Sequence, residues 1–372
     1  MHILVTGGAG FIGSHTVDAL IAAGHHVRIL DNLQPRVHPR GMPRYLSPDA
    51  EFIRGDVRER GDWEKALKGI DVVYHLAAYQ DYMTDFGTFI HVNAVAPALL
   101  LELIVMKGYP VRRIIFASSQ AVYGEGKYRC NVHGDFFPAP RPLAQLERGD
   151  WEMHCPVCNR EAAWQPTDEA AVSPHTSYAI SKYAAELTFI NLGRRYGIPT
   201  VGLRYSITHG PRNSFYNAYS GICRIFSQRL MNDQAPVIFE DGVQTRDYIN
   251  VEDVVRANLL VLDEPRADWE IFNVGGGSTV TVIDFAYLLS RALGKKIEPL
   301  IPGEFRFGDT RHTVSDISKL KKCGWEPRVP LEETVKRYVE WLANQEEARG
   351  GFYRDADREM RRGKVIMKAH HQ

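Results

Sequence analysis

The chain has 372 residues, of which 44% are hydrophobic and 24% are charged, with 45 basic and 45 acidic side chains. This composition is typical of a globular protein with one large domain or a domain with an appended lobe. A formal net charge of zero argues against a nucleic-acid-binding or membrane-surface protein, because both need an excess of basic residues. No apolar run approaches the ~18 residues expected of a membrane span, and the chain starts directly in a strand pattern, so we expect a cytoplasmic protein.

The amino-terminal stretch combines an apolar strand pattern, glycines at positions 7, 10 and 13, and then a helical pattern. In such a turn Gly7 lets the chain reverse, Gly10 lets the backbone approach a diphosphate, and Gly13 lets the helix pack closely on the strand. The N–H groups at the helix start favour phosphate. A second strand pattern ends at Asp31, near the spacing of a ribose-binding carboxylate, which favours NAD because it repels the 2′-phosphate of NADP. The alternative is a structural turn without a nucleotide.

Strand and helix patterns alternate through the first half of the chain. After a Pro/Arg-rich loop at 34–48, strands are expected at 51–57, 71–78 and 113–119, and helices at 62–68 and 88–106. Mostly apolar strands separated by helices predict a parallel sheet that is covered on both faces. Ligands bind beyond the carboxyl ends of such strands, so Asp31, Asp56, Ser118 and Ser119 are candidates to meet one. His75 lies within an apolar strand and is interpreted as a core histidine.

Residues 125–170 break this alternation and contain two pairs of metal-binding residues. Each pair has two intervening residues, and the pairs are Cys130 with His133 and Cys155 with Cys158. This spacing matches a Cys3His zinc site, and four ligands leave no open position, which predicts a structural metal. In the reducing cytosol, cysteine pairs indicate metal before disulfide. The alternative is four unrelated reduced residues. Cys223 and Cys323 are weaker candidates because they lie in apolar periodic segments.

A helical pattern begins at Ser177 and places Tyr178 and Lys182 four residues apart, on one face of the helix. A lysine ammonium stabilises a phenolate and lowers the pKa of a phenol from about 10 towards neutrality. The pair can therefore act as a base that takes a proton from a sugar hydroxyl. The alternative is a chance spacing, which the preceding glycine turn and the strand ending at Ser119 make a weaker explanation.

The carboxyl-terminal half predicts a smaller lobe of mixed strands and helices, with helical patterns at 280–294 and 331–344. Its arginines are suited to a diphosphate because a guanidinium group offers a planar fork of donors, although each taken alone is better explained as a surface ion-pair partner. The candidates are Arg212, Arg246, Arg306 and Arg311. The tail at 345–372 is charged and poor in apolar residues, and we expect it to be frayed or peripheral.

Together these residues resemble the extended short-chain dehydrogenase/reductase family, in its group of nucleotide-sugar epimerases and dehydratases, over about residues 1–342. The motifs that carry the resemblance are Thr6-Gly7-Gly8-Ala9-Gly10-Phe11-Ile12-Gly13, Asp31-Asn32-Leu33, Gly55-Asp56-Val57, His75-Leu76-Ala77-Ala78, Ser118-Ser119-Gln120-Ala121-Val122-Tyr123-Gly124, Tyr178 to Lys182, Thr245-Arg246-Asp247-Tyr248 and Asn273-Val274-Gly275-Gly276-Gly277.

The resemblance implies an α/β fold: a doubly wound parallel Rossmann sheet, a smaller carboxyl-terminal α/β substrate lobe and a zinc-ribbon-like insertion. We expect the NAD-binding domain at 1–124 and 171–205, the insertion at 125–170, a mainly substrate-binding lobe at 206–344 and the tail at 345–372. A homodimer through the helices at 88–106 and 178–196 is also implied, with no nucleic-acid or membrane partner.

The resemblance also implies a role for each matching residue. Ser119 and Tyr178 hold the reacting hydroxyl, Lys182 completes the catalytic set, and Arg246 and Arg306, with Arg212 as a further candidate, hold a nucleotide diphosphate. Asp56 and Val57 are expected to hold the adenine, and Asn93 and Lys182 the nicotinamide ribose region. The remaining expected NAD contacts are Gly7, Gly10, Phe11, Ile12, Gly13, Asp31, Asn32, Leu76, Ala77, Ala78, Tyr178 and Tyr205.

Dehydratases of this family carry Asp-Glu where this chain has Gln120 and Ala121, which disfavours dehydration. The resemblance instead favours a 4-epimerase, in which hydride moves from sugar C4 to NAD and returns on the other face. The insertion and the segment 217–222 resemble the branch that contains dTDP-L-rhamnose and UDP-glucose 4-epimerases. Alternatives are a 4-ketoreductase or dehydrogenase, a dehydratase-like enzyme and a non-catalytic NAD sensor. One departure concerns the substrate: Ser206-Ile207-Thr208 follows Arg204-Tyr205, where the family usually has Asn.

Overall fold

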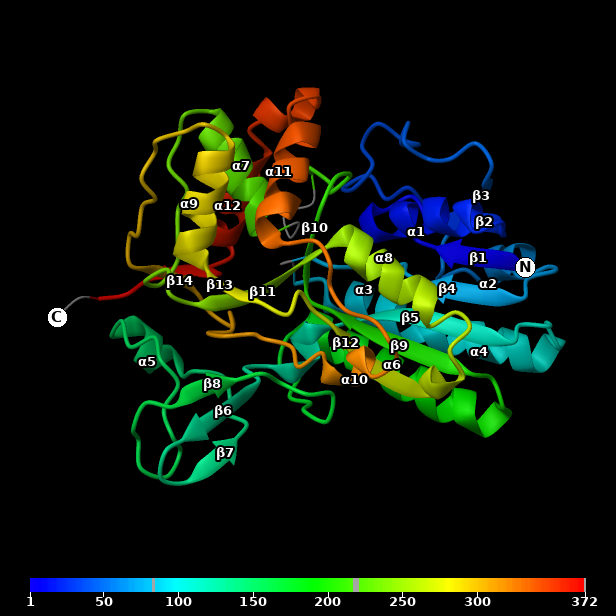
Figure 1. Cartoon of the computed structure of the whole chain (residues 1–372), viewed down its shortest axis with the longest axis horizontal. Coiled ribbons are helices and arrows are strands. Elements are labelled where there is room, and N and C mark those ends of the chain that lie inside the picture. The colour runs from blue at the N-terminus through cyan, green and yellow to red at the C-terminus, as the bar shows by residue number, and fades with distance from the viewer. Residues whose placement is uncertain (82–83, 217–220, 371–372) are drawn as a thin grey trace.

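A seven-stranded parallel sheet forms the centre of the larger lobe in the computed structural model, which describes residues 1–81, 84–216 and 221–370. The strand order is β12-β9-β5-β4-β1-β2-β3, and every neighbouring pair is parallel (Figure 1). The strands are β1 (His2–Thr6), β2 (His26–Asp31), β3 (Glu51–Arg54), β4 (Val72–His75), β5 (Arg113–Ser119), β9 (Thr200–Tyr205) and β12 (Glu270–Val274). The doubly wound parallel sheet expected from the sequence is therefore confirmed.

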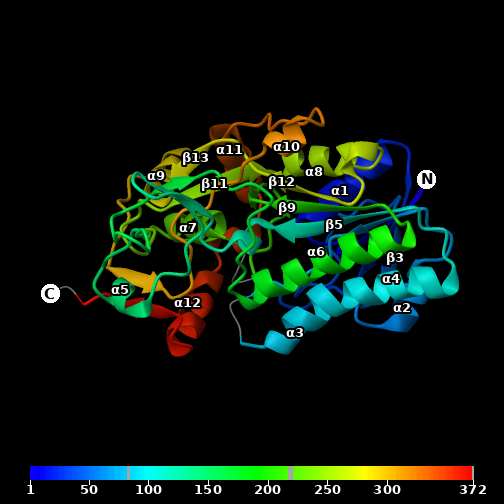
Figure 2. The same cartoon turned by 90° about the horizontal axis from the view of Figure 1, so that it is seen from below.

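Helices cover both faces of this sheet, and each face has its own apolar core. One core packs the sheet against α1 and α8 through residues such as Leu20 and Val254, and the other packs it against α2, α4 and α6 through residues such as Trp63, Leu100 and Phe189 (Figure 2). The helices are α1 (Phe11–Ala22), α2 (Arg60–Ala66), α3 (Phe86–Ile90), η1 (His91–Val95), α4 (Ala96–Lys107), α6 (Ser177–Tyr196), α8 (Val251–Leu260), α10 (Ser318–Lys321) and the short turns η2 (Gln120–Tyr123) and η3 (Pro265–Ala267).

The helical run Phe86–Lys107 spans 22 residues and, by length and composition alone, could cross a membrane. This corrects the expectation that no apolar run reaches that length. In the structure the run lies beside α6 on the sheet, and Leu100, Leu103 and Ile104 are buried in the core. A buried core helix passes the same test of length and composition as a membrane span.

The smaller lobe contains a three-stranded sheet, β10-β11-β13, and a third apolar core that includes Phe226, Phe285 and Tyr338. Its elements are β10 (Ile207–His209), β11 (Thr245–Asn250), β13 (Thr279–Thr281), α7 (Ile222–Met231), α9 (Val282–Ala292) and α11 (Leu331–Leu342). Between β11 and β13 the chain returns to the larger lobe as α8 and β12. The range 206–344 therefore supplies both lobes, because the seventh strand of the large sheet comes from within it.

The insertion forms a three-stranded antiparallel sheet, β7-β6-β8, which projects from the rest of the molecule at the lower left of Figure 1. Its elements are β6 (Lys127–Cys130), β7 (Gly134–Phe136), α5 (Leu143–Glu147) and β8 (Ala163–Gln165). Its apolar cluster is small, with Tyr128, Met153 and Ala162 buried. So little apolar surface leaves the insertion dependent on other interactions for its stability.

The described part of the tail, up to residue 370, forms regular elements and packs on the smaller lobe, so of the two expectations, frayed or peripheral, the first does not hold for these residues. It forms η4 (Glu346–Arg349), α12 (Phe352–Arg362) and β15 (Ile366–Lys368), and β15 pairs antiparallel with β14 (Glu304–Arg306). Arg361 donates to both carboxylate oxygens of Glu304 at 2.8 Å, and Tyr353 and Met360 are buried. These apolar residues of the tail are buried against the lobe. The amino-acid composition of the tail does not show where these residues lie.

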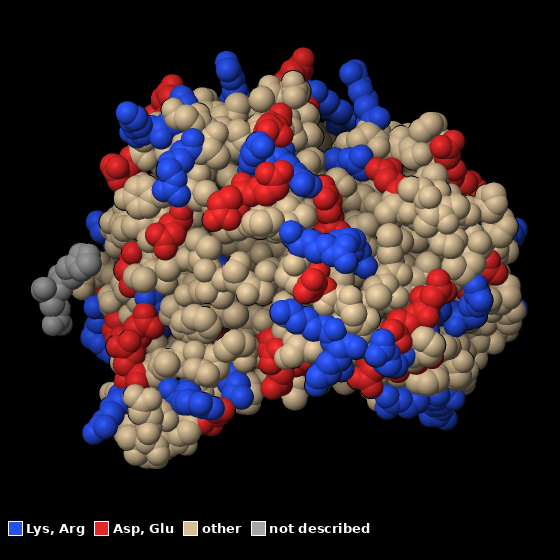
Figure 3. All heavy atoms as spheres, viewed as in Figure 1, with Lys and Arg blue, Asp and Glu red and all other residues tan. Residues whose placement is uncertain are grey.

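Basic and acidic side chains are interspersed over the face shown in Figure 3. This mixture agrees with the equal numbers of basic and acidic residues in the chain.

Candidate active site

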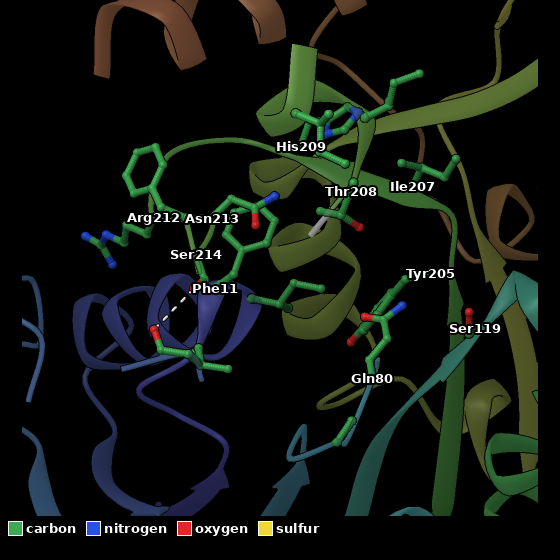
Figure 4. Close-up of a pocket in the computed structure, with 18 of the residues that line it drawn as sticks. Phe11, Gln80, Ser119, Tyr205, Ile207, Thr208, His209, Arg212, Asn213 and Ser214 are labelled. Carbon is green, nitrogen blue, oxygen red and sulfur yellow. Dashed lines mark hydrogen bonds between the residues drawn. The ribbon is translucent and has the colours of Figure 1, made fainter. Parts of the chain in front are cut away.

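A cavity of about 1060 Å³ lies at the carboxyl ends of the large sheet's strands, where the two lobes meet. Figure 4 shows it bordered by Phe11 and Gln80 from the larger lobe and by Thr208 and His209 from the smaller lobe. The glycine turn, the ends of β4 and β5, and the start of α6 form one side. This is the position at which doubly wound sheets bind ligands.

The glycine turn is tightly packed on its inner side and open towards the cavity. Gly7 has a φ of 69°, and a Cβ there would lie 2.7 Å from the Ala77 backbone. A Cβ on Gly13 would lie 2.1 Å from the Gly7 carbonyl oxygen, whereas one on Gly10 would meet that oxygen at 3.2 Å and no other atom within 4 Å. Phe11 and Ile12, whose N–H groups begin α1, also line the cavity. The turn therefore fits a diphosphate approaching at Gly10.

Asp31 joins the glycine turn to the loop that follows β2. Its two carboxylate oxygens accept hydrogen bonds from the backbone N–H groups of Ala9, at 3.0 Å, and Leu33, at 2.9 Å. Beside it, Asn32 donates to Asp56 at 2.9 Å. Burial raises the pKa of Asp56, but hydrogen bonds from Arg58 and Asn32 outweigh this effect and hold it at about 2. Asp31, Asn32, Asp56 and Val57 are not among the residues that line the cavity.

Residues 37–45 of the Pro/Arg-rich loop line the cavity, a role that the sequence analysis did not assign to them. Tyr45 donates from its hydroxyl to the Ala9 carbonyl oxygen at 2.9 Å. Arg40 pairs with Glu347 of the tail at 2.7 Å, and Ser214 of the smaller lobe donates to the Val37 carbonyl oxygen at 3.2 Å. The loop thus bridges the two lobes across the cavity. In the sequence, only the position of this loop soon after Asp31 indicated that it could lie near the cavity.

The predicted catalytic residues Ser119, Tyr178 and Lys182 all line the cavity. Ser119 ends β5 and caps η2, accepting from the Ala121 N–H at 3.2 Å. The Lys182 ammonium lies 5.9 Å from the centre of the Tyr178 ring and donates to the Ala117 carbonyl oxygen at 2.9 Å. Burial lowers the pKa of Lys182 to about 8. The structure therefore brings a hydroxyl, a phenol and a desolvated ammonium to one wall.

One turn further along α6, Glu186 attaches the helix to the sheet. It accepts from the Ser118 hydroxyl at 2.5 Å and receives two hydrogen bonds from Arg204, at 2.8 and 2.7 Å. All three side chains are buried. Ser118 and Ser119 both border the cavity, but the Ser118 hydroxyl is bound to Glu186 and so positions α6. A buried, bidentate ion pair specifies this geometry strongly, because removal of either partner leaves an uncompensated charge.

Asn93 lies in η1, and its side-chain amide is fully occupied by protein groups. It accepts from the Tyr79 N–H at 2.8 Å and donates to the Tyr79 carbonyl oxygen at 2.9 Å and to the Ser181 hydroxyl at 3.0 Å. The structure thus shows it fixing the segment after β4 against α6. It is not among the residues that line the cavity.

The segment after β4 supplies Leu76 and Ala78 to the cavity, and the N–H of Ala77 donates to the Thr6 hydroxyl at 3.2 Å. His75 is buried beside Thr6, and burial lowers its pKa to about 3, which confirms its interpretation as a core histidine. Tyr205 borders the cavity and donates to Asn258 at 2.6 Å.

Arg212, Arg246 and Arg306 line the cavity, and Arg311 does not. Arg212 pairs with Asp18 at 2.7 Å, Arg306 pairs with Asp309 at 2.7 Å, and Arg246 donates to backbone carbonyl oxygens. Arg311 is 0% exposed, and its guanidinium is bound by the carboxylates of Glu152, Glu240 and Asp241. Its interpretation as a diphosphate ligand is therefore wrong.

Gln120 lines the cavity, and its Oε1 has no hydrogen-bond partner among the described residues. Within the described lining, the carboxylates are Asp309, Glu346 and Glu347, all from the carboxyl-terminal part of the chain. The wall with Ser119 and Tyr178 thus presents an amide where dehydratases of the family present an acid. Ile207 and Thr208 also border the cavity, whereas residues 217–220 of the segment noted above lie outside the described part of the chain.

His209 was not identified from the sequence as a cavity residue. It stacks on Tyr248 and Phe285, with ring centres 5.1 and 5.5 Å away, and burial lowers its pKa to about 3. Neither ring nitrogen has a hydrogen-bond partner in the part of the chain that the structure describes. No motif pointed to it, because a single histidine after a short strand carries no distinctive pattern.

The four predicted metal ligands form one cluster at the end of β6, with all ligand atoms within 4.8 Å of one another. The Cys130 sulfur lies 3.7 Å from the Cys158 sulfur and 3.7 Å from His133 Nδ1, which lies 3.4 Å from the Cys155 sulfur. Ligands of a tetrahedral zinc ion are separated by roughly 3.5–3.8 Å, given usual zinc–ligand bond lengths. The donor set and its spacing therefore fit a closed zinc site.

The chain matches the model of the NAD dependent epimerase/dehydratase family over residues 3–141 and 157–275, which leaves part of the insertion unmatched. It is 31% identical to the dTDP-L-rhamnose 4-epimerase of Burkholderia thailandensis over 92% of this chain and 95% of that protein. A crystal structure of the Thermotoga maritima UDP-glucose 4-epimerase with UDP-glucose is similar at a TM-score of 0.76 and 33% identity, over 92% and 99% of the two chains.

The Thermus thermophilus UDP-glucose 4-epimerase in complex with NAD is similar at a TM-score of 0.73 and 29% identity, over 94% and 100%. These similarities extend over both lobes and include the glycine turn and the wall with Tyr178. The chain is therefore an enzyme of the NAD dependent epimerase/dehydratase family.

Proposed function

We propose that the protein is an NAD-dependent nucleotide-sugar 4-epimerase. The observation that carries the proposal is the placement of Ser119, Tyr178 and Lys182 on the same side of the cavity as an open glycine turn, with Gln120 in place of an acid. Relatives described as 4-epimerases match this chain over more than nine tenths of its length, which supports the proposal.

Bound NAD supplies the acceptor and donor of the hydride at sugar C4. Tyr178 takes the proton from the C4 hydroxyl and later returns one, with the Ser119 hydroxyl hydrogen-bonded to the same oxygen. The Lys182 ammonium stabilises the phenolate form of Tyr178. Because this wall, in the part of the chain that the structure describes, lacks a carboxylic acid, it offers no group to drive elimination of water across C5–C6.

The substrate proposed is a nucleoside-diphosphate sugar. The guanidinium groups of Arg212, Arg246 and Arg306 all border the cavity, and guanidinium groups suit the planar recognition of phosphate oxygens. The similar Thermotoga structure was solved with UDP-glucose, which supports this class of substrate.

We further propose that Cys130, His133, Cys155 and Cys158 hold a structural zinc ion. The support is the donor set, its spacing and the small apolar core of the insertion. A bound zinc ion would supply the folding free energy that this core lacks. Reduced thiols of this kind agree with the cytoplasmic location expected from the sequence.

A homodimer through the helical run Phe86–Lys107 and α6 is also proposed. These helices expose large apolar side chains, namely Phe86, Ile90, Val95, Met106, Ile180 and Leu187. Several exposed large apolar side chains on neighbouring helices mark an association surface. Light scattering of the purified protein tests this part of the proposal, and a monomer at micromolar concentration would contradict it.

The proposed activity is tested by incubating the purified protein with UDP-, dTDP-, GDP- and CDP-sugars and following the products by NMR. We expect a C4 epimer to form without added NAD(H), because epimerisation has no net redox change. Conversion that requires stoichiometric NAD(H) would replace the proposal with a 4-ketoreductase or dehydrogenase. No turnover of any sugar, with NAD bound, would favour a sensor.

A further inference from the structure

The insertion is joined to the smaller lobe by buried charges, chiefly those of Arg141. Its guanidinium donates to both carboxylate oxygens of Glu240, at 2.8 and 3.1 Å, and to the carbonyl oxygens of Asp309 and Trp151, each at 2.8 Å. The side chains of Arg141 and Glu240 are nearly inaccessible. Arg141 thus ties the insertion to the lobe at the segment that follows β14.

Arg311 forms a second connection in the same cluster. Its N–H donates to Glu125 at 2.8 Å, and its guanidinium donates to Glu152 of the insertion at 2.9 Å and to Asp241 at 2.7 Å. Glu240 is shared, since Arg311 also donates to it at 3.0 Å. Two arginines and their carboxylates therefore form one network between the insertion and residues 305–313, and it is buried at Arg141, Arg311 and Glu240.

Aromatic contacts from the insertion reinforce this network at His312. The rings of Trp164 and Tyr128 lie 6.1 and 6.4 Å from the His312 ring. His312 Nδ1 accepts from the Thr245 N–H at 3.0 Å, at the start of β11. The insertion is therefore linked, through His312, to the strand that carries Arg246.

The other side of the segment 305–313 faces the cavity and holds two cavity arginines. Arg246 donates to the carbonyl oxygens of Thr310, at 2.9 Å, and Arg311, at 2.8 Å. Arg306 pairs with Asp309, whose carbonyl oxygen is held by Arg141. The same short segment thus contacts the insertion on one side and orients both guanidinium groups on the other.

We propose that the insertion 125–170 is a positioning element for the substrate, with Arg141 holding the segment 305–313 so that Arg246 and Arg306 meet a nucleoside diphosphate. The inference rests on the proposed function and assigns a role to the insertion, of which the family model leaves residues 142–156 unmatched. Arg141 is a positioning residue, because it contacts the segment and not the cavity.

The test compares Arg141→Gln, the milder Glu152→Gln and a control, Arg129→Gln, in the NAD-loaded enzyme. Arg129 lies in the insertion as well, on β6, but it is exposed and pairs with Asp135. Binding of UDP and dTDP is measured by calorimetry, NAD content by absorbance after release, and folding by thermal unfolding. Substrate kinetics then separate KM from kcat.

We expect Arg141→Gln to weaken UDP or dTDP binding about tenfold and Glu152→Gln about threefold, with the control within about twofold. KM should rise while kcat and NAD content stay close to wild type, a split that general loss of folding would not produce. If a folded Arg141→Gln or Glu152→Gln variant bound UDP and dTDP as wild type does, the positioning role would be overturned. A wild-type protein that binds none of UDP, dTDP, GDP and CDP would instead overturn the proposed function.

Discussion

The Lys182 ammonium lies one helical turn from Tyr178, 5.9 Å from the centre of its ring, and is held there by the Ala117 carbonyl oxygen. The spacing of the two residues on α6 is local, but the position of the ammonium depends on β5. Because β5 supplies both Ala117 and Ser119, one strand positions two parts of the proposed catalytic wall.

Tyr178→Phe removes the proposed base while keeping the shape of the ring. We expect kcat to fall by about 10²–10⁴-fold, the usual contribution of a positioned acid–base group, with NAD still bound. Steady-state assays and the absorbance of released NAD measure the two effects. Tyr196→Phe, at the exposed end of the same helix, is the control. Normal turnover in Tyr178→Phe would exclude this residue as the base.

The buried Lys182 predicts a specific dependence on pH. Burial lowers its pKa from 10.5 to about 8, so the ammonium that stabilises the phenolate is lost as the pH rises above about 8. Activity should therefore decline on the alkaline side through this residue. A kcat/KM profile between pH 6 and about 10 checks this decline. An activity that stays constant across that range would contradict it.

The free energy of unfolding should rise with pH over the range in which the activity declines. Between about pH 8 and 10.5 the unfolded chain binds the Lys182 proton and the folded chain does not, so the free energy of unfolding gains a contribution that rises with pH. Lys182→Met removes the buried ammonium, and at pH 7 it should stabilise the fold by up to roughly 3 kcal/mol while lowering kcat. Thermal unfolding of wild type and variant at about pH 8 and pH 10.5 shows whether the variant loses this pH dependence.

Alanine substitutions of Gly13 and Gly10 should have different effects, the first on stability and the second on NAD binding. In Gly13→Ala the Cβ meets the Gly7 carbonyl oxygen at 2.1 Å, so we expect lost stability. In Gly10→Ala the nearest atom is 3.2 Å away, so the protein should fold but bind NAD more weakly, since the methyl group occupies the approach of the diphosphate. NAD titration and thermal unfolding distinguish the two. Gly61→Ala, with open space around it, is the control.

Cys158→Ser tests the proposed zinc site. We expect metal analysis to give one zinc ion per wild-type chain and little in the variant, with lower thermal stability because binding free energy is folding free energy. Cys323→Ser, which lies far from the cluster in sequence, should keep the metal. Equal zinc in Cys158→Ser and wild type would rule out this ligand set.

Features with a local pattern could be predicted from the sequence. The glycine turn, the Tyr178–Lys182 pair and the Cys/His pairs each depend on short spacings, and the structure brings each set together. Alternating apolar patterns were enough for the large sheet, because both faces of its strands are buried.

Features that depend on distant contacts could not be predicted. The pairing of Arg361 with Glu304 joins segments with no shared pattern, so the tail looked peripheral. Arg311 could not be separated from the other candidate arginines, because an arginine that binds phosphate and one that binds carboxylates look identical in sequence. The loop 37–45 likewise has no periodicity, and only its bridging contacts reveal its place over the cavity.

The return of the chain to the large sheet as β12 has a practical consequence for dissecting the molecule. A fragment that stops at residue 205 would contain six of the seven strands, and β9 would become an edge strand that pairs with β5 but lacks its partner β12. All six residues of β9 are buried in the intact protein, so such a fragment would present an apolar edge that pairs with other copies. A soluble truncated form must therefore keep residues through Val274.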